Sequence, residues 1–194
     1  MPKLLAFAGS LRQDSFNKKL VKIAAEGASN AGAEVTYIDL KDYPLPIYDQ
    51  DLEAQSGIPE NALKLKELMQ SHHGFLIASP EYNGSLTAAL KNMIDWVSRP
   101  TGGEPPLALT AFRDKTAAIM ATSPGGLGGL RGLGHLRIIL EGVGVLVIPD
   151  QKAVPGAMQA FDDSGNLVDG NLKGEIAGLG AKLATITAKL NTES

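Results

Sequence analysis

A short apolar run that turns directly into a polar loop and then a helix is the feature that most limits how this chain can fold. Residues 4–8 (LLAFA) are continuously apolar, as expected for a central parallel strand covered on both faces. Gly9 ends the run, and four donor side chains then follow within eight positions: Ser10, Arg12, Ser15 and Asn17. Unpaired N–H groups at a helix start, together with the helix dipole, favour an anion there. The stretch therefore predicts a phosphate site.

This phosphate would have to be held without a common nucleotide motif. No G-x-G-x-x-G follows the first strand, so a Rossmann dinucleotide site is not supported, and no G-x-x-x-x-G-K-[ST] is present for a P-loop NTPase. Ser15 or Asn17 could instead only cap the helix, which is a common role for these residue types. The arginine inside the cluster favours the phosphate interpretation.

Strand and helix patterns alternate along the rest of the chain. Strands are expected at 4–8, 35–40, 74–79, 116–122 and 143–148. Helices are expected at 17–31, 59–71, 86–97, through 133–140 and at 172–190, with irregular segments at 43–51 and 150–170. This alternation predicts an α/β doubly wound parallel sheet of five strands with helices on both faces, and we expect its strand order to be 2-1-3-4-5. At 194 residues we expect a single domain, 1–194.

Three polar loops are expected to meet at one edge of this sheet. They follow the first, third and fourth strands, at residues 9–17, 80–85 and 123–129. In doubly wound sheets, ligands bind beyond the carboxyl ends of the strands, where the strand order reverses. The order 2-1-3-4-5 places the three loops side by side, so we expect one ligand site. The glycine-rich third loop could alternatively be only a flexible connection.

The composition argues against several classes of function. A net charge of −3 provides no basic field for nucleic acid, and no apolar run is long enough to span a membrane. We therefore expect a cytoplasmic protein with no nucleic-acid or membrane partner. The chain has no cysteine, which excludes disulfides, a thiolate nucleophile and cysteine-ligated metals. Redox chemistry would need a bound cofactor.

Several motifs, in their order and spacing, resemble the NADPH-dependent FMN reductase family of flavodoxin-like proteins, which includes quinone, azo-dye and chromate reductases. The motifs are GSLRQDSFN at 9–17, LPIYDQD at 45–51, PEYNGS at 80–85, LKNMIDW at 90–96 and GGLRGLGHLRIIL at 128–140. The resemblance spans most of the chain up to Pro149. It implies a flavodoxin-like FMN-binding domain.

The resemblance also implies a role for each loop. Ser10, Arg12, Ser15 and Asn17 would hold the FMN phosphate, which agrees with their chemistry, because arginine is a charged, forked donor. The isoalloxazine ring would be lined by the second loop: Pro80, Glu81, Tyr82, Asn83 and Gly84. Ser123 and Gly126 of the third loop would close the other side.

The activity that this implies is electron transfer from NADPH or NADH through FMN to a small-molecule acceptor, such as a quinone or free flavin, by a ping-pong mechanism. Hydride chemistry belongs to the cofactor, so we expect no catalytic side chain. A flavodoxin-type electron carrier, or a flavin-binding protein without nicotinamide reactivity, is the alternative. Carriers of that type are typically strongly acidic, which the net charge of −3 does not match.

Several remaining residues have simpler expected roles. His72 and His73 are expected to be solvent-facing caps of the preceding helix, and His135 to have a packing or subunit-contact role. With no third convergent ligand, no metal site is predicted. Trp96 is expected to be an interface or core residue, and as an unassigned aromatic side chain it could anchor a subunit contact. By resemblance we expect a homodimer or homotetramer, with contacts from helix 86–97 and from the helix that contains Arg131, His135 and Arg137.

Overall fold

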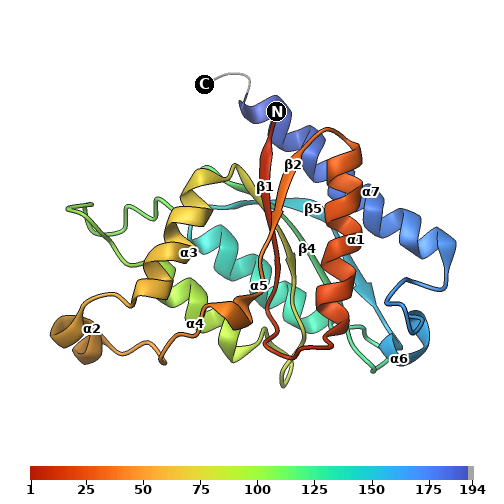
Figure 1. The fold of residues 1–194 in the computed structure, drawn as a ribbon, viewed down its shortest axis with the longest axis horizontal. Coiled ribbons are helices and arrows are strands. Elements are labelled where there is room, and N and C mark those ends of the chain that lie inside the picture. Colours follow the sequence, from red (N-terminus) through yellow and green to blue (C-terminus); the bar gives the residue numbers. More distant parts are fainter. Residues whose placement is uncertain (192–194) are drawn as a thin grey trace.

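The computed structural model describes residues 1–191, in which five parallel strands form one sheet (Figure 1). The strand order is β2-β1-β3-β4-β5, and each neighbouring pair is parallel. The strands are β1 (Lys3–Ala8), β2 (Glu34–Tyr37), β3 (Gly74–Ala78), β4 (Thr116–Thr122) and β5 (Leu146–Val154). The predicted flavodoxin-like, doubly wound sheet is confirmed.

Helices cover both faces of this sheet (Figure 1). One face carries α1 (Phe16–Asn30) and α7 (Gly170–Asn191). The other carries α3 (Glu60–Ser71), α4 (Ala88–Val97) and α5 (Leu130–Gly142). Three short helices lie in the connections: η1 (Leu40–Asp42), α2 (Gln50–Ser56) and α6 (Ala157–Ala160).

The core lies in two layers, one on each side of the sheet. In β1, Leu5 and Phe7 pack with α3, α4 and α5, while the alternate residues Leu4 and Ala6 pack with α1 and α7. All four side chains are buried, because helices cover both faces of the strand. Burying a leucine or phenylalanine contributes about 1.5–3 kcal/mol. Two-sided burial therefore explains why the run is continuously apolar.

Two glycines allow α1 and α7 to touch backbone to backbone. A Cβ at Gly27 would lie 2.0 Å from the carbonyl oxygen of Ala177, and one at Gly180 would lie 1.8 Å from that of Ala24. A larger side chain at either position would push the helices apart. Their close packing fixes α1 against the sheet, and with it the loop that precedes α1.

The predicted limits of the fifth strand, 143–148, are wrong. The strand continues past Pro149 to Val154, and α6 follows within the segment that was expected to be irregular. Ala117 pairs with Val147 but Ile119 pairs with Gln151, so the register shifts around Pro149. Proline is tolerated there because β5 is an edge strand and the irregular pairing needs no N–H at that residue.

Trp96 is a core residue, which is one of the two roles expected for it, and the expectation that it anchors a partner is wrong. Its side chain is fully buried, and its indole N–H donates to the carbonyl oxygen of Pro46 at 2.8 Å. The ring of Tyr48 packs edge-on at 5.0 Å between centroids. The segment after β2 therefore covers the tryptophan within the chain itself.

His72 is also not a solvent-facing cap. It is buried, and its ring nitrogens contact the carbonyl oxygen of Leu68 at 2.6 Å and the hydroxyl of Thr36 at 2.9 Å. These contacts tie the end of α3 to β2. His73 is half-buried, and its Nδ1 accepts a hydrogen bond from the backbone N–H of Lys3 at 3.0 Å.

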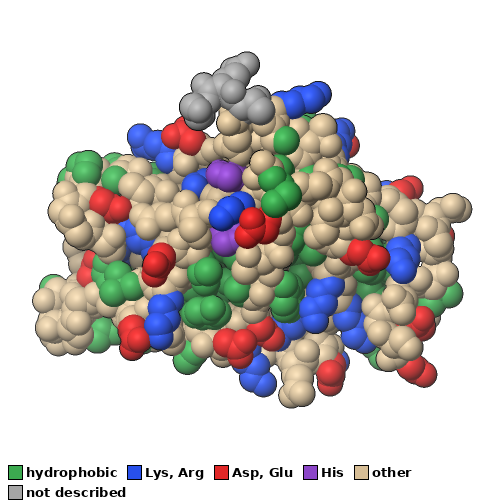
Figure 2. Space-filling model, turned by 45° about the horizontal axis from the view of Figure 1, so that its top comes forward, with side chains coloured by type: hydrophobic (Ala, Val, Ile, Leu, Met, Phe, Trp, Pro, Cys, Tyr) green, Lys and Arg blue, Asp and Glu red, His purple; other side chains and the backbone are tan. Residues whose placement is uncertain are grey.

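Acidic and basic side chains are interspersed over the face shown in Figure 2. That face carries no continuous basic patch of the kind that binds nucleic acid. Within residues 1–191, every helix is too short or too polar to cross a bilayer.

A buried ion pair organises the long connection between α4 and β4. The ammonium of Lys66 donates to Glu104 and to the carbonyl oxygen of Arg99, and both charged side chains are largely buried. Glu104 also accepts hydrogen bonds from the backbone N–H of Thr101 at 2.9 Å and from the hydroxyl of Thr110 at 2.7 Å. Burial alone would raise the pKa of Glu104, but these bonds and the Lys66 charge lower it to about 2.

We predict that Glu104→Gln lowers the free energy of unfolding at pH 7 by on the order of 3 kcal/mol, because Lys66 loses its buried partner. The pKa of Glu104 is lower in the folded chain, so its contribution is present above pH 4.5 and is lost as the pH falls towards 2. Urea unfolding of both proteins at several pH values measures the difference, which should shrink in acid.

The matched control is Glu60→Gln, which breaks an exposed pair with Lys64 on α3 and should leave the unfolding midpoint nearly unchanged. A difference for Glu104→Gln that stays constant down to pH 2.5 would contradict the assigned pairing.

Candidate functional site

The loops after β1, β3 and β4 meet around a cavity of about 200 Å³ at the carboxyl edge of the sheet. Eight of the predicted site residues line it: Ser10, Arg12, Ser15, Asn17, Pro80, Glu81, Tyr82 and Ser123. Asn83 and Gly84 form the tip of the second loop, and Gly126 lies in an adjoining cavity. The predicted convergence of the three loops is therefore present in the structure.

Arg12 and Ser15 provide donor groups that the protein itself does not use. Within residues 1–191, Arg12 has no carboxylate partner, and its guanidinium carbon lies 5.8 Å from the ring centre of Phe16. Ser15 occupies the N-cap position of α1, but its hydroxyl makes no capping hydrogen bond with the described chain. The backbone N–H groups of Phe16 and Asn17, the first two residues of α1, also have no partner among residues 1–191. Together these groups form an anion-binding end of the cavity.

Asn17 has a different arrangement from the one the sequence suggested. Its side-chain amide donates to the carbonyl oxygen of Thr122 at 2.9 Å and accepts from the N–H of Thr122 at 3.0 Å. Asn17 is buried, and this pair joins α1 to the end of β4. These two bonds use the side-chain oxygen and one of the two side-chain N–H groups, so a phosphate would meet the backbone N–H of Asn17 and the remaining side-chain N–H.

Ser10 shapes the start of the same loop. Its hydroxyl accepts a hydrogen bond from the backbone N–H of Arg12 at 3.3 Å, and its side chain is almost completely buried. This bond turns the chain sharply after β1, so that Arg12 and Ser15 both face the cavity.

The second loop forms a tight turn that presents Tyr82 to solvent. Tyr82 and Ser85 exchange two backbone hydrogen bonds, at 2.9 and 3.1 Å, around Asn83 and Gly84. Tyr82 is 57% exposed, whereas the carboxylate of Glu81 points to Arg131 of α5 rather than into solvent. Hydrogen bonding from Arg131 holds the pKa of Glu81 below its usual value, although burial opposes this.

The third loop contributes Ser123 to both cavities. Its backbone N–H donates to the carbonyl oxygen of Val154 at 3.3 Å, and its carbonyl oxygen accepts from Ala157 at 3.0 Å. The adjoining cavity, of about 270 Å³, is lined by Glu81, Ser123, Gly126 and Arg131, among others. A Cβ at Gly126 would meet no atom of the described chain within 4 Å, so this part of the loop borders open space.

Three lining residues were missed from the sequence: Phe16, Thr122 and Pro124. Phe16 stacks on Phe161 with ring centres 5.4 Å apart, which holds it at the wall of the cavity. The sequence could have indicated all three from their neighbours. Phe16 lies between the predicted site residues Ser15 and Asn17, and Thr122 and Pro124 lie on either side of Ser123.

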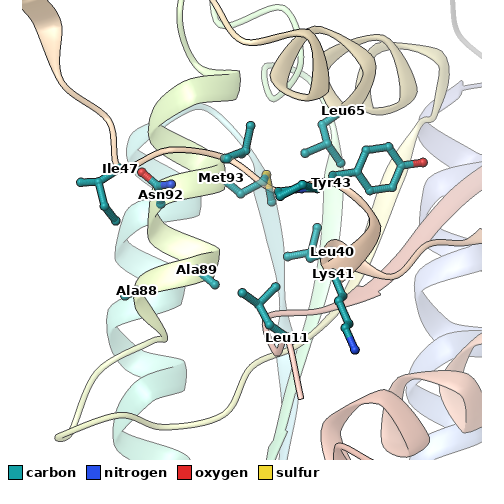
Figure 3. A pocket seen from close by; sticks show the side chains of 12 residues that line it. Leu11, Leu40, Lys41, Tyr43, Ile47, Leu65, Ala88, Ala89, Asn92 and Met93 are labelled. Carbon is teal, nitrogen blue, oxygen red and sulfur yellow. The ribbon is translucent and has the colours of Figure 1, made fainter. Parts of the chain in front are cut away.

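A separate cavity of about 260 Å³ lies on the other side of the first loop, beside Leu11 (Figure 3). Side chains from α3, from α4 and from the segment after β2 face it, including Leu40, Leu65 and Met93. The amide of Asn92 is engaged with the backbone of Tyr48 and Pro46. This cavity is mainly apolar, so its chemistry does not suit a phosphate.

The chemistry of the first cavity suits a ligand with an anionic end and a flat body. The anion would lie against Arg12, Ser15 and the start of α1, and the body would reach the turn at 80–84 and the third loop. These donors fit the phosphate of FMN.

Comparison with known proteins agrees with this geometry. The model of the NADPH-dependent FMN reductase family matches residues 2–159. An NAD(P)H:quinone oxidoreductase of Solanum tuberosum is 34% identical over 193 residues, covering 97% of this chain and 94% of the relative. A 2-hydroxy-1,4-benzoquinone reductase of a Burkholderia species is 33% identical over 167 residues, covering 86% of this chain and 85% of the relative.

A solved structure gives the same result. The flavoenzyme FerB of Paracoccus denitrificans, an NAD(P)H:(acceptor) oxidoreductase, superimposes with a TM-score of 0.79 at 29% identity, covering 97% of this chain and 98% of FerB. With matching sequence motifs, strand order and site, the chain belongs to the NADPH-dependent FMN reductase family.

Proposed function

We propose that this protein is an FMN-dependent NAD(P)H oxidoreductase that reduces a quinone, free flavin or similar small acceptor. The observation that carries the proposal is the anion-binding end of the cavity, where Arg12 and Ser15 present donors that the described chain leaves free. Family membership identifies the ligand class that these donors fit, namely the FMN phosphate.

Each loop has a distinct task in this proposal. Arg12, the Ser10 and Ser15 hydroxyls and the first N–H groups of α1 bind the phosphate. Pro80, Glu81, Tyr82, Asn83 and Gly84 form the wall beside the ring, in which Glu81 takes part through its backbone. Ser123 and Gly126 border the opposite side.

Bound FMN supplies the redox chemistry, by taking a hydride from NADPH or NADH and passing electrons to the acceptor. The chain's own residues position the cofactor and leave one face of the site open to solvent beside Tyr82. No histidine lines the cavity among the described residues, which supports a mechanism without a catalytic acid or base. Binding and orientation are therefore the main contributions of the protein.

A flavodoxin-type electron carrier is the rival function, because it uses the same fold. The relatives support the reductase: the two similar proteins are named as quinone reductases, and FerB as an NAD(P)H-dependent flavoenzyme. We propose that the acceptor is a planar molecule that can stack at the open face.

We also propose a homodimer or homotetramer in the cytoplasm. Exposed apolar side chains on and near α5 support a subunit contact there, namely Leu127, Leu130, Ile138 and Leu146. Trp96 is not available for a subunit contact, because it is buried within its own chain.

We predict that the purified protein carries or takes up FMN, and that NADPH or NADH bleaches the flavin absorbance of the complex within seconds. An electron carrier would bind FMN but react with nicotinamides only slowly. Stopped-flow measurement of the flavin absorbance after mixing with NADPH distinguishes the two. A protein that binds FAD but not FMN would contradict the proposed phosphate site.

We predict ping-pong kinetics with a quinone acceptor, because the nicotinamide and the acceptor share one open face and must occupy it in turn. Double-reciprocal plots at several NADPH concentrations should give parallel lines. Intersecting lines would instead require two separate sites and would exclude a shared face.

We predict that Arg12→Ala weakens FMN binding by about ten- to a hundredfold, because a charged hydrogen bond contributes roughly 1.5–3 kcal/mol. Its unfolding midpoint should stay unchanged, since within residues 1–191 the side chain has no ion-pair partner. Fluorescence titration of FMN measures the affinity. Lys41→Ala, which removes a cation outside the three loops, is the control and should bind FMN normally.

A further inference from the structure

The turn at residues 81–85 cannot be held in place by its own hydrogen bonds alone. It consists of one antiparallel bridge between Tyr82 and Ser85, with Asn83 and Gly84 both at positive φ, 52° and 81°. These angles are those of a type I′ hairpin turn. An isolated hairpin is marginal in water even when it is longer, so the position of the turn depends on contacts from elsewhere.

Those contacts come from α5, about 50 residues further along the chain. The carboxylate of Glu81 accepts hydrogen bonds from Nε of Arg131 at 2.7 Å and also from its Nη2. It accepts two more from the backbone N–H groups of Arg131, at 3.1 Å, and Gly132, at 3.3 Å. The other end of the turn is held as well, because Nδ1 of His135 lies 3.0 Å from the Ser85 hydroxyl.

The Glu81 carboxylate also stabilises the start of α5. Gly129 occupies the N-cap position and offers no side chain, and the first turn of α5 contains no acidic residue. The N–H groups of Arg131 and Gly132 would be left without partners if Glu81 did not accept from them. The Glu81 carboxylate is therefore an N-cap supplied by a different loop, favoured also by the helix dipole.

Close packing makes the contact stiff. A Cβ at Gly132 would lie 3.1 Å from the carbonyl oxygen of Ser85, so the helix backbone rests almost directly on the turn. The side chain of Glu81 is only 8% exposed, whereas that of Arg131 is 64% exposed. Solvent therefore reaches the guanidinium but is largely excluded from the carboxylate.

We propose that the side chains of Glu81 and Arg131 have a positioning role: they hold the turn at 82–84 in the place where it contacts the flavin ring, and neither side chain touches the flavin itself. The inference rests on the proposed function in so far as the turn faces FMN. The Glu81 side chain therefore supports the loop from behind, and Tyr82, Asn83 and Gly84 are the residues of the loop that contact the ring.

The test compares Glu81→Gln, Arg131→Gln and the double variant with the unsubstituted protein. Amide hydrogen exchange of Tyr82 and Ser85, measured by NMR without flavin, should become about ten- to a hundredfold faster in either single variant, because hydrogen bonds to charged groups are lost. At saturating FMN, reduction by NADPH should slow by about ten- to a hundredfold, and the midpoint potential of the flavin should shift. Glu60→Gln, which breaks an exposed ion pair on α3, should change neither.

The double variant tests whether the two residues act as one unit. It should be affected no more than the more affected single variant, whereas effects that multiply would mean independent roles and would overturn the pairing. Unchanged exchange at Tyr82 and Ser85 in both single variants would overturn the proposal whatever the flavin does. If the unsubstituted protein fails to bind FMN, the proposed function fails, and the exchange data still decide whether Glu81 and Arg131 hold the turn.

Discussion

The pair of hydrogen bonds between the Asn17 side chain and the backbone of Thr122 is the contact on which the geometry of the site depends. It spans 105 residues of sequence and is buried. Because it joins the first turn of α1 to the last residue of β4, the loops after β1 and β4 cannot separate without leaving buried polar groups unpaired. Such a loss costs about 1–3 kcal/mol for each group, which is large against the stability of a typical domain.

The neighbouring loops are held by contacts of the same kind. The hydroxyl of Thr87 donates to the carbonyl oxygen of Gly9 at 2.6 Å and accepts from the N–H of Leu90 at 3.2 Å, so it caps α4 and ties α4 to the first loop. Gly9 lies so close to Leu90 that a Cβ would be 2.9 Å from the Leu90 Cβ. Each loop is therefore fixed by its neighbour before any ligand binds, which reduces the entropy lost on binding.

The sequence predicts the parts of this arrangement that depend on local pattern. All five strands, the strand order and the helices flanking the sheet follow from hydrophobic runs and periodicity, and β4 matches its predicted limits. The predictions that were wrong concern features set by contacts between segments that are distant in the sequence. Pro149 normally ends a strand, but a register shift at a sheet edge accommodates it. Trp96 and His72 are buried by segments distant in sequence, and the partner of Asn17 lies on β4, where no short-range signal could reveal it.

The two ends of the site therefore respond differently to changes in sequence. In the proposed complex the phosphate end is built from residues 10–17, so a substitution there would act on the ligand directly. The proposed ring end depends on Glu81 and Arg131, which lie 50 residues apart, so a substitution on α5 would alter ring contacts without touching the cofactor. The side chain of Tyr82 is 57% exposed, and only its backbone is hydrogen-bonded within the turn. We therefore propose that side chains at this position can change acceptor preference while the backbone of the turn stays fixed.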